Sequence, residues 1–299
     1  MTPSAYRSSL PNIRRHSRQQ LLFRKWLRWT VAAATYYSGL AFLPRLPGSK
    51  PQVRILMYHS IDDDHSYLHS VSPIAFEKQM QFLATKYNVI SLNQILEYFD
   101  GDRAWPDNPV VITFDDGLAN VYTTAYPILK KYKLPATVFL VPDWITSGET
   151  GHAKQRHMTW DQIREMSLNK ISIGAHTISH RSLPTLTPAQ VRHELLESKT
   201  RLEQQLCQPI RFFAYPFGAF RDINSAIIQA VQESGYTCAV TSLSGTNRNS
   251  TNPYTLRRTE IEVVDGIWLF GKIMTGALDS WIVFQRLRWI SQVLRRKNK

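Results

Sequence analysis

The chain has 299 residues, 43% of them hydrophobic, which is enough for one large α/β domain or two small ones with a sizeable core. Its formal net charge of +13 would suit a nucleic-acid-binding protein, but the charge is unevenly distributed. Residues 1–50 hold nine Lys or Arg and residues 280–299 hold six, and neither segment contains an acid. The other 21 of the 36 basic residues share the middle of the chain with all 23 acids, so that part has a net charge of −2. This distribution argues against a nucleic-acid partner.

The N-terminal segment, residues 1–50, is basic, apolar and aromatic, as in "LLFRKWLRWTVAAATYY". The 16 uncharged residues between Arg28 and Arg45 fall short of the roughly 20 that a membrane-spanning helix needs. No clear small-residue cleavage site follows, which disfavours a signal peptide. We expect the segment to associate with an anionic membrane surface. The alternative is a helix that packs on the core and keeps a solvated basic face.

Residues 51–265 alternate between runs typical of strands and runs typical of helices. Strands are predicted at 53–59, 88–92, 109–114, 136–141, 170–176, 210–216, 237–242 and 257–263. Helix starts are predicted at Ser72-Pro73 and at Thr187-Pro188, and a helix end is predicted at Gly235. The two cysteines, Cys207 and Cys238, are far apart and predict no disulfide framework.

Seven or eight repeats of strand and helix predict a parallel sheet with helices outside it. That number of repeats favours a barrel of the TIM type, complete or incomplete, over an open doubly wound sheet. In such barrels the chemistry lies at the carboxyl ends of the strands. The residues at those ends are therefore the candidate functional residues.

Three predicted strands end on residues that can bind a metal or carry protons. The run "VVITF" leads to Asp115 and Asp116, "ILMY" leads to His59, and "ISIGA" leads to His176 and then His180. The spacing of the last pair is a weak signal alone, but two histidines and one carboxylate make a site for a catalytic divalent ion. One aspartate is then expected to bind the metal and the other to take a proton from water.

Taken in order, "TFDDG", "HTISH" and "YPFG" resemble the polysaccharide deacetylase family (NodB homology domain, carbohydrate esterase family 4), over roughly residues 51–265. The resemblance implies a distorted (β/α)7 barrel that removes acetyl groups from an N-acetylated sugar, commonly N-acetylglucosamine in a polymer. It also implies that Asp115 is the catalytic base. Asp116, His176 and His180 would then bind a divalent metal, usually zinc, with cobalt or nickel as alternatives.

The third motif departs from the family pattern, because Ala214 stands where an arginine usually supports the base. We expect Arg258 to replace that arginine from another strand, with Arg257 as the competing candidate. Tyr215 and Phe217 are expected to contact the substrate. The backbone N–H of Phe217 corresponds to the family's oxyanion position.

The general acid also departs from the family pattern, because the chain has no histidine after residue 193. His59, at the end of the first strand, resembles the acid of a circularly permuted branch similar to the deacetylases of poly-N-acetylglucosamine. The first and last strands of a closed barrel are neighbours, so such a permutation can preserve the geometry of the site. The alternative is that His59 is a buried polar residue that closes the barrel.

The C-terminal segment, residues 266–299, is expected to form a basic amphipathic helix. Its apolar residues recur at helical spacing, at Val283, Leu287, Ile290 and Leu294. With the N-terminal segment it predicts attachment to a membrane surface, expected to be the bacterial inner membrane, with no prediction of the side.

The predicted function is a metal-dependent carbohydrate N-deacetylase whose partners are an N-acetylated oligo- or polysaccharide and an anionic membrane surface. One alternative is a deacylase or deformylase of a lipid-linked sugar. The other is a non-catalytic carbohydrate-binding barrel, against which the full set of four candidate Asp and His residues argues.

Overall fold

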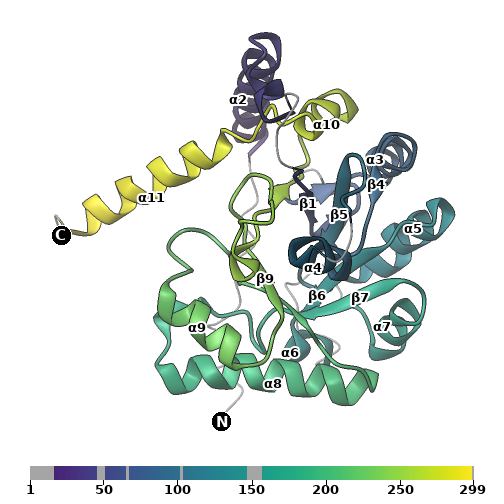
Figure 1. The fold of residues 1–299 in the computed structure, drawn as a ribbon, viewed down its shortest axis with the longest axis vertical. Helices are drawn as coiled ribbons and strands as arrows, with labels where there is room; N and C mark the ends of the chain where they lie inside the picture. Colours follow the sequence, from purple (N-terminus) through teal and green to yellow (C-terminus); the bar gives the residue numbers. More distant parts are fainter. Residues whose placement is uncertain (1–16, 46–50, 65–66, 102–103, 147–156, 298–299) are drawn as a thin grey trace.

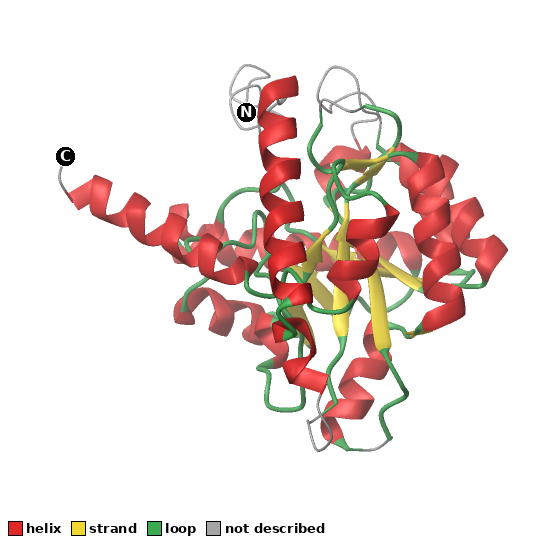
Figure 2. Ribbon diagram, turned by 90° about the horizontal axis from the view of Figure 1, so that it is seen from above, coloured by secondary structure: helices red, strands yellow, loops and turns green. Residues whose placement is uncertain are grey.

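The computed structural model describes residues 17–45, 51–64, 67–101, 104–146 and 157–297 (Figure 1). At its centre is a parallel sheet with strand order β10-β1-β5-β6-β7-β8-β9, in which β4 also pairs with β5. Helices surround the strands (Figure 2). The predicted parallel sheet with helices outside is therefore confirmed. Residues 1–16 and 46–50 of the predicted membrane segment lie outside the described residues.

The strands are β1 (Arg54–Tyr58), β2 (Ser60–Ile61), β3 (Ser70–Val71), β4 (Asn88–Val89), β5 (Pro109–Phe114), β6 (Ala136–Leu140), β7 (Ile171–Ala175), β8 (Phe212–Ala214), β9 (Cys238–Val240) and β10 (Thr259–Glu260). The α-helices are α2 (Arg18–Tyr37), α3 (Pro73–Lys86), α4 (Leu92–Asp100), α5 (Tyr126–Tyr132), α6 (Pro142–Thr146), α7 (Trp160–Ser167), α8 (Pro188–Leu206), α9 (Ser225–Glu233), α10 (Ile267–Met274) and α11 (Trp281–Lys297). The short 3₁₀ or π helices are η1 (Leu40–Arg45), η2 (Val121–Ala125), η3 (Leu183–Thr185) and η4 (Pro253–Thr255).

The sheet curves far enough that its two ends approach each other. At one end β10 pairs in parallel with β1, with Leu56 opposite Thr259. At the other end, Val240 of β9 forms a parallel bridge with Leu256, three residues before β10 begins. The segment around residues 256–260 therefore links β9 to β1. This arrangement explains why groups on the first and last strands can meet at one site.

Several strands are shorter than predicted: those predicted at 210–216 and 237–242 are reduced to Phe212–Ala214 and Cys238–Val240. The predicted strand 88–92 is reduced to Asn88–Val89, since Ser91 caps α4 and forms a capping box with Gln94. The predicted strand 257–263 is reduced to Thr259–Glu260. The predicted helix start at Ser72 agrees with the structure, because its side chain accepts a hydrogen bond from the backbone of Ala75.

The helix α2 packs on the barrel through a buried cation. The Arg28 guanidinium is 3% exposed and donates hydrogen bonds of 2.6 and 2.9 Å to Asp265 and of 2.7 Å to Glu262. Trp29 stacks on Trp268 with ring centroids 4.3 Å apart. This part of the N-terminal segment is thus joined to the barrel, as in the alternative interpretation of the sequence, although its outer face stays apolar.

The C-terminal segment differs from its prediction over its first half. The helix α10 contributes Leu269, Phe270 and Ile273 to the hydrophobic core, so the barrel's core continues past the predicted boundary at residue 265. The predicted basic helix corresponds to α11, which extends away from the body of the molecule in Figure 1. Among the described helices, none combines the length and the hydropathy needed to cross a membrane.

Candidate active site

The candidate site is a cavity of about 530 Å³ that opens at the carboxyl ends of the strands. Its walls include residues that directly follow, or end, strands of the sheet. His59 follows β1, Asp115 and Asp116 follow β5, His176 follows β7, and Glu260 ends β10. The sheet therefore brings the predicted Asp and His residues together.

Asp116, His176 and His180 form a group with the donor atoms of a metal site. Their ligand atoms lie within 4.8 Å of one another, and each histidine Nε2 is 3.7 Å from Asp116 Oδ1. His176 Nδ1 lies 2.7 Å from the carbonyl oxygen of Ala214. When Nδ1 donates to that carbonyl, Nε2 carries a lone pair toward Asp116 and is free to bind a cation.

The local backbone allows this convergence. Asp116 and His180 both have left-handed backbone conformations, with φ of 72° and 59°, which is uncommon for residues other than glycine. Thr177, with φ of 60°, also accepts a hydrogen bond of 2.9 Å from the His180 N–H through its hydroxyl. Residues 176–180 therefore form a tight turn rather than a helix, and this turn directs both imidazoles inward.

The electrostatics of this group fit a cation. Burial, followed by the charge of Asp115, raises the pKa of Asp116 to about 7. Burial also lowers the pKa of His176, and burial together with the nearby His176 lowers that of His180 well below its usual range. Asp116 Oδ1 and His180 Nδ1 are buried atoms with no hydrogen-bond partner among the described residues. A carboxylate and two neutral imidazoles in this setting match the donor set that divalent zinc prefers.

Asp115 has the opposite environment, since it is held by a buried arginine. Arg258 is fully buried and donates two hydrogen bonds, of 2.7 and 2.6 Å, to the two carboxylate oxygens. Its Nε also donates to the Thr241 carbonyl at 2.9 Å, which fixes the guanidinium plane. Burial opposes ionisation of Asp115, but the charge and hydrogen bonds of Arg258, together with the nearby His176 and His59, lower the pKa to about 2. The competing candidate, Arg257, is exposed.

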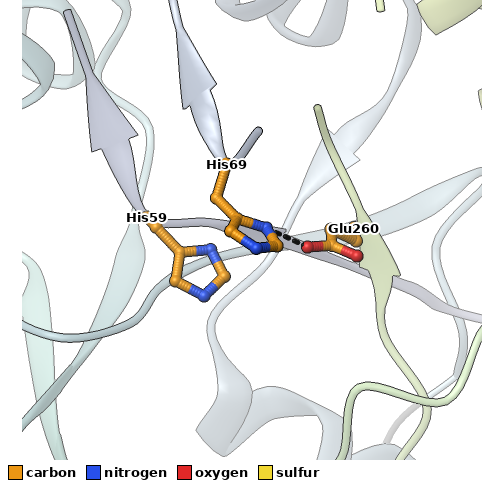
Figure 3. A group of neighbouring side chains, drawn as sticks. All are labelled: His59, His69 and Glu260. Carbon is orange, nitrogen blue, oxygen red and sulfur yellow. Dashed lines mark ion pairs between the residues drawn. The ribbon is translucent and has the colours of Figure 1, made fainter. Parts of the chain in front are cut away.

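His59 lines the cavity next to a second histidine, as Figure 3 shows. Its ring lies 4.8 Å from that of His69, and His69 is ion-paired with Glu260. Burial, and then the charge of His69, lower the pKa of His59 to about 3. Although burial opposes it, Glu260 raises the pKa of His69. These opposite shifts in pKa favour protonation of His69 over protonation of His59.

Sequence reasoning missed His69 and Glu260. His69 directly precedes β3, which pairs with β2 beside the site. Glu260 ends the last strand of the sheet, two residues after Arg258. The strand-end rule that selected Asp115 could not select Glu260, because the strand predicted at 257–263 continued past it.

The two predicted substrate contacts have different positions. Phe217 lines the cavity, is 43% exposed and has its ring 4.9 Å from that of His180. Tyr215 is 1% exposed, donates a hydrogen bond of 3.0 Å to the Tyr254 carbonyl and packs on Phe213. Its side chain faces the core and is not among the residues that line the cavity, so the structure does not place it where it could contact a substrate in that cavity.

Comparison with known proteins shows which family has a similar sequence. The family model for polysaccharide deacetylase matches residues 102–239. YxkH of Bacillus subtilis (strain 168), whose name places it among the polysaccharide deacetylases, is 34% identical over 208 residues, or 69% of this chain and 70% of that protein. The chain belongs to the polysaccharide deacetylase family.

The solved structures give this polysaccharide deacetylase the same fold. The Streptococcus pyogenes deacetylase PplD, in complex with acetate, superposes with a TM-score of 0.68 at 26% identity, over 76% of this chain and 99% of that chain. The predicted distorted (β/α)7 barrel is thereby confirmed. This polysaccharide deacetylase is a hydrolase, a carbohydrate N-deacetylase.

A further relative has a more specific name. The poly-beta-1,6-N-acetyl-D-glucosamine N-deacetylase of Staphylococcus aureus (strain MSSA476) is 28% identical over 171 residues. That match covers 54% of this polysaccharide deacetylase and 58% of the relative.

Proposed function

We propose that the protein is a divalent-metal-dependent enzyme that removes N-acetyl groups from a polymer of N-acetylglucosamine. The observation that carries this proposal is the contrast between two adjacent carboxylates. Asp115 is paired with buried Arg258, whereas Asp116 faces two neutral imidazoles and keeps one oxygen without a hydrogen-bond partner among the described residues. Environments that separate the pKa values of two neighbouring acids support different roles for them.

Asp116, His176 and His180 would hold the cation. A divalent ion bound there supplies Lewis-acid activation of water and of the acetyl carbonyl. Zinc is the expected ion because the donors are two imidazoles and one carboxylate, and cobalt or nickel can satisfy the same set.

Asp115 is the proposed base. Its lowered pKa keeps the carboxylate ionised throughout the neutral range, so it is always ready to accept a proton. It would take that proton from water as the water oxygen forms a bond to the acetyl carbon. Arg258 holds both carboxylate oxygens and so restricts the directions from which Asp115 can accept the proton. The backbone N–H of Phe217 remains the proposed donor to the carbonyl oxygen.

His59 is the proposed acid for the departing nitrogen. The bond between the acetyl carbon and the sugar nitrogen breaks as that nitrogen receives a proton, and the products are acetate and a free amino sugar. The low pKa of His59 means that it requires a proton from its surroundings before each turnover. The adjacent His69, whose pKa Glu260 raises, is the proposed source of that proton. Its ring, 4.8 Å from that of His59, supports such a supply.

The substrate proposal is supported by the S. aureus relative, whose name specifies poly-beta-1,6-N-acetyl-D-glucosamine. The experiment is to chelate the purified protein, reload it with zinc, cobalt or nickel, and incubate it with N-acetylglucosamine oligomers. We expect mass spectrometry to detect loss of acetyl groups and enzymatic assay to detect acetate, both only after metal is restored. Intact oligomers under all metal conditions would refute the proposed function.

We also propose that the outer faces of α2 and α11 bind an anionic membrane, most simply the bacterial inner membrane. On α2, Leu22, Phe23 and Trp26 are 57%, 64% and 61% exposed, and on α11 Leu287 and Leu294 are 58% and 57% exposed. Exposed apolar residues beside basic ones suit an interfacial helix. Both helices also border the cavity, which favours a deacylase of a lipid-linked sugar as the second candidate function.

Cosedimentation with vesicles tests the membrane proposal. We expect the protein to bind vesicles that contain phosphatidylglycerol, to bind phosphatidylcholine vesicles weakly, and to dissociate as salt increases. Trp26→Ser should weaken binding, whereas Ile74→Ser, a change at a 69% exposed residue of α3, should leave it unchanged. Equal binding by both variants would contradict the proposal. The second candidate function, a deacylase of a lipid-linked sugar, requires in addition that the metal-loaded protein remove the acyl group from a lipid-linked N-acetylglucosamine.

A further inference from the structure

The helix α11 forms one wall of the catalytic cavity. Six of its residues line the cavity that contains Asp115 and the candidate metal ligands: Trp281, Phe284, Gln285, Arg288, Trp289 and Gln292. They recur every three or four positions, so they occupy one face of the helix. From the first to the last, this face extends about 16 Å at 1.5 Å per residue. It is therefore longer than a single sugar ring.

Burial along the helix supports the same orientation. Trp281, Gln285, Trp289 and Gln292 are half-buried, whereas Leu287 and Leu294 are 58% and 57% exposed. The helix thus has two distinct faces. One borders the cavity, and the other is the apolar outer face described above.

Specific contacts hold the cavity-facing side in register with the barrel. The Gln285 side chain accepts a hydrogen bond of 2.9 Å from the Ser244 N–H and donates one of 2.9 Å to the Ser242 carbonyl. Both serines follow β9, at the same edge of the sheet as the catalytic residues. One turn further along, the Trp289 ring lies 6.0 Å from Phe220, which also lines the cavity.

We propose that the cavity-facing side of α11, with Phe220 opposite Trp289, binds the sugar units that flank the residue being deacetylated. The chemistry matches a neutral carbohydrate chain. Indole and phenyl faces pack on the C–H faces of pyranose rings, while the Gln292 amide and the Arg288 guanidinium can hydrogen-bond hydroxyl and acetamido groups. A pocket of mostly apolar walls with a few polar groups that fix orientation is typical of ligand sites.

This inference rests on the proposed function and names the part of the enzyme that selects a polymer. It assigns Trp289 and Gln292 to substrate binding and Gln285 to positioning of the helix. It predicts that α11 affects the binding of long substrates and leaves the chemistry at Asp115 unchanged. A substrate too short to reach Trp289 should be insensitive to α11.

The test compares substrates of different length in the full-length, metal-loaded protein. Trp289→Ala should raise KM about five- to twentyfold for a pentamer of N-acetylglucosamine, with kcat nearly unchanged. Its turnover of a small aryl acetate ester should equal that of the unmodified protein. Gln292→Ala should show a smaller rise in KM, and Trp289→Phe, which keeps an aromatic face, should retain most of the affinity. Leu287→Ala, on the opposite face of the same helix, is the matched control and should change neither the KM for the pentamer nor the turnover of the ester.

A binding measurement separates this inference from the proposed reaction. Calorimetric titration of the metal-free protein with the pentamer should give a Kd that Trp289→Ala weakens by a similar factor, although no turnover occurs. If the unmodified protein deacetylates no oligomer but still shows this binding difference, the proposed function fails and the inference stands. If Trp289→Ala and Leu287→Ala give the same KM and Kd for the pentamer, the inference is wrong. Loss of vesicle binding in Trp289→Ala with unchanged pentamer affinity would also overturn it, because lipid would then be the ligand of this face.

Discussion

Arg258→Met should destabilise the protein strongly, because it removes the counter-charge of a buried carboxylate. Arg258 is fully buried, and Asp115 is 2% exposed. The two hydrogen bonds between them, of 2.7 and 2.6 Å, satisfy both carboxylate oxygens. Methionine, like arginine, has an unbranched aliphatic side chain, but it is smaller and carries no charge. Asp115 would then remain in the interior as an uncompensated anion.

The structure provides two measures of the effect. Lowering the pKa of Asp115 from 3.8 to about 2 corresponds to about 2.4 kcal/mol in favour of the ionised form. Burial opposes that shift, so the combined stabilisation by Arg258, His176 and His59 is larger than this figure, and Arg258 is the largest of these three. Removal of one partner from a buried ion pair costs about 3–5 kcal/mol. We therefore expect a loss of that size in the free energy of unfolding, and a Tm lower by on the order of 10 °C.

The effect should depend on pH in a defined direction. In the unmodified protein the lowered pKa contributes stability that is present above the unfolded value, near 3.8, and is lost as the pH falls through about 2. In the variant, burial without Arg258 should raise the pKa of Asp115 instead. Its destabilisation is then largest at neutral pH and decreases as the carboxylate takes up a proton on acidification.

The assay is thermal unfolding of metal-free protein, followed by circular dichroism from about pH 4 to pH 8. Arg257→Met is the matched control, since it makes the same change at an exposed neighbour. Arg258→Lys should be intermediate, because an ammonium cannot make both hydrogen bonds in the geometry of a guanidinium. If Arg258→Met and Arg257→Met unfold within about 2 °C of each other at pH 7, the buried pair does not stabilise the fold as argued.

Further expectations concern the metal, the proton donor and the N-terminal helix. His176→Ala should lose bound zinc in elemental analysis while keeping its circular dichroism spectrum, and full metal occupancy would exclude it as a ligand. His59→Gln should lower kcat on the amide by about 10²–10⁴ and on an aryl acetate ester far less, whereas equal losses would favour a structural role. Glu260→Gln should move the basic limb of the pH–rate profile to lower pH, because the Glu260 carboxylate raises the pKa of His69. An unchanged basic limb would show that His69 and Glu260 do not supply the proton. Arg28→Met should lower Tm by on the order of 10 °C and Lys25→Met, at an exposed position, should not; similar Tm values would show that α2 contributes little to stability.

Much of the candidate site could be predicted because it depends on local rules. A strand predicted at 109–114 places Asp115 at its carboxyl end, whatever the rest of the fold does. The same rule identified His59 and His176. Parallel strands bring their carboxyl ends to one edge, so these side chains meet without any knowledge of loops. Helix starts at Ser72 and Thr187 were similarly predictable, since a cap acts within one turn.

Residues whose roles depend on register or packing were not predictable in this way. Successive residues in extended chain face opposite sides, so a shift of one position decides whether Arg257 or Arg258 enters the interior. Sequence alone could only favour one of them. Tyr215 was predicted to face the substrate, but it turns into the core and donates a hydrogen bond to the Tyr254 carbonyl.

The sequence by itself thus determined the succession of strands and helices along the chain and the residues at the strand ends. Tertiary structure alone decided which distant segments complete the site. His69 meets Glu260 across 190 intervening residues because β10 lies beside β1. The α11 face borders the cavity because Gln285 bonds to the loop after β9. An amphipathic helix presents the same sequence pattern to a membrane, a core or a substrate cavity, and only its packing partners distinguish among them.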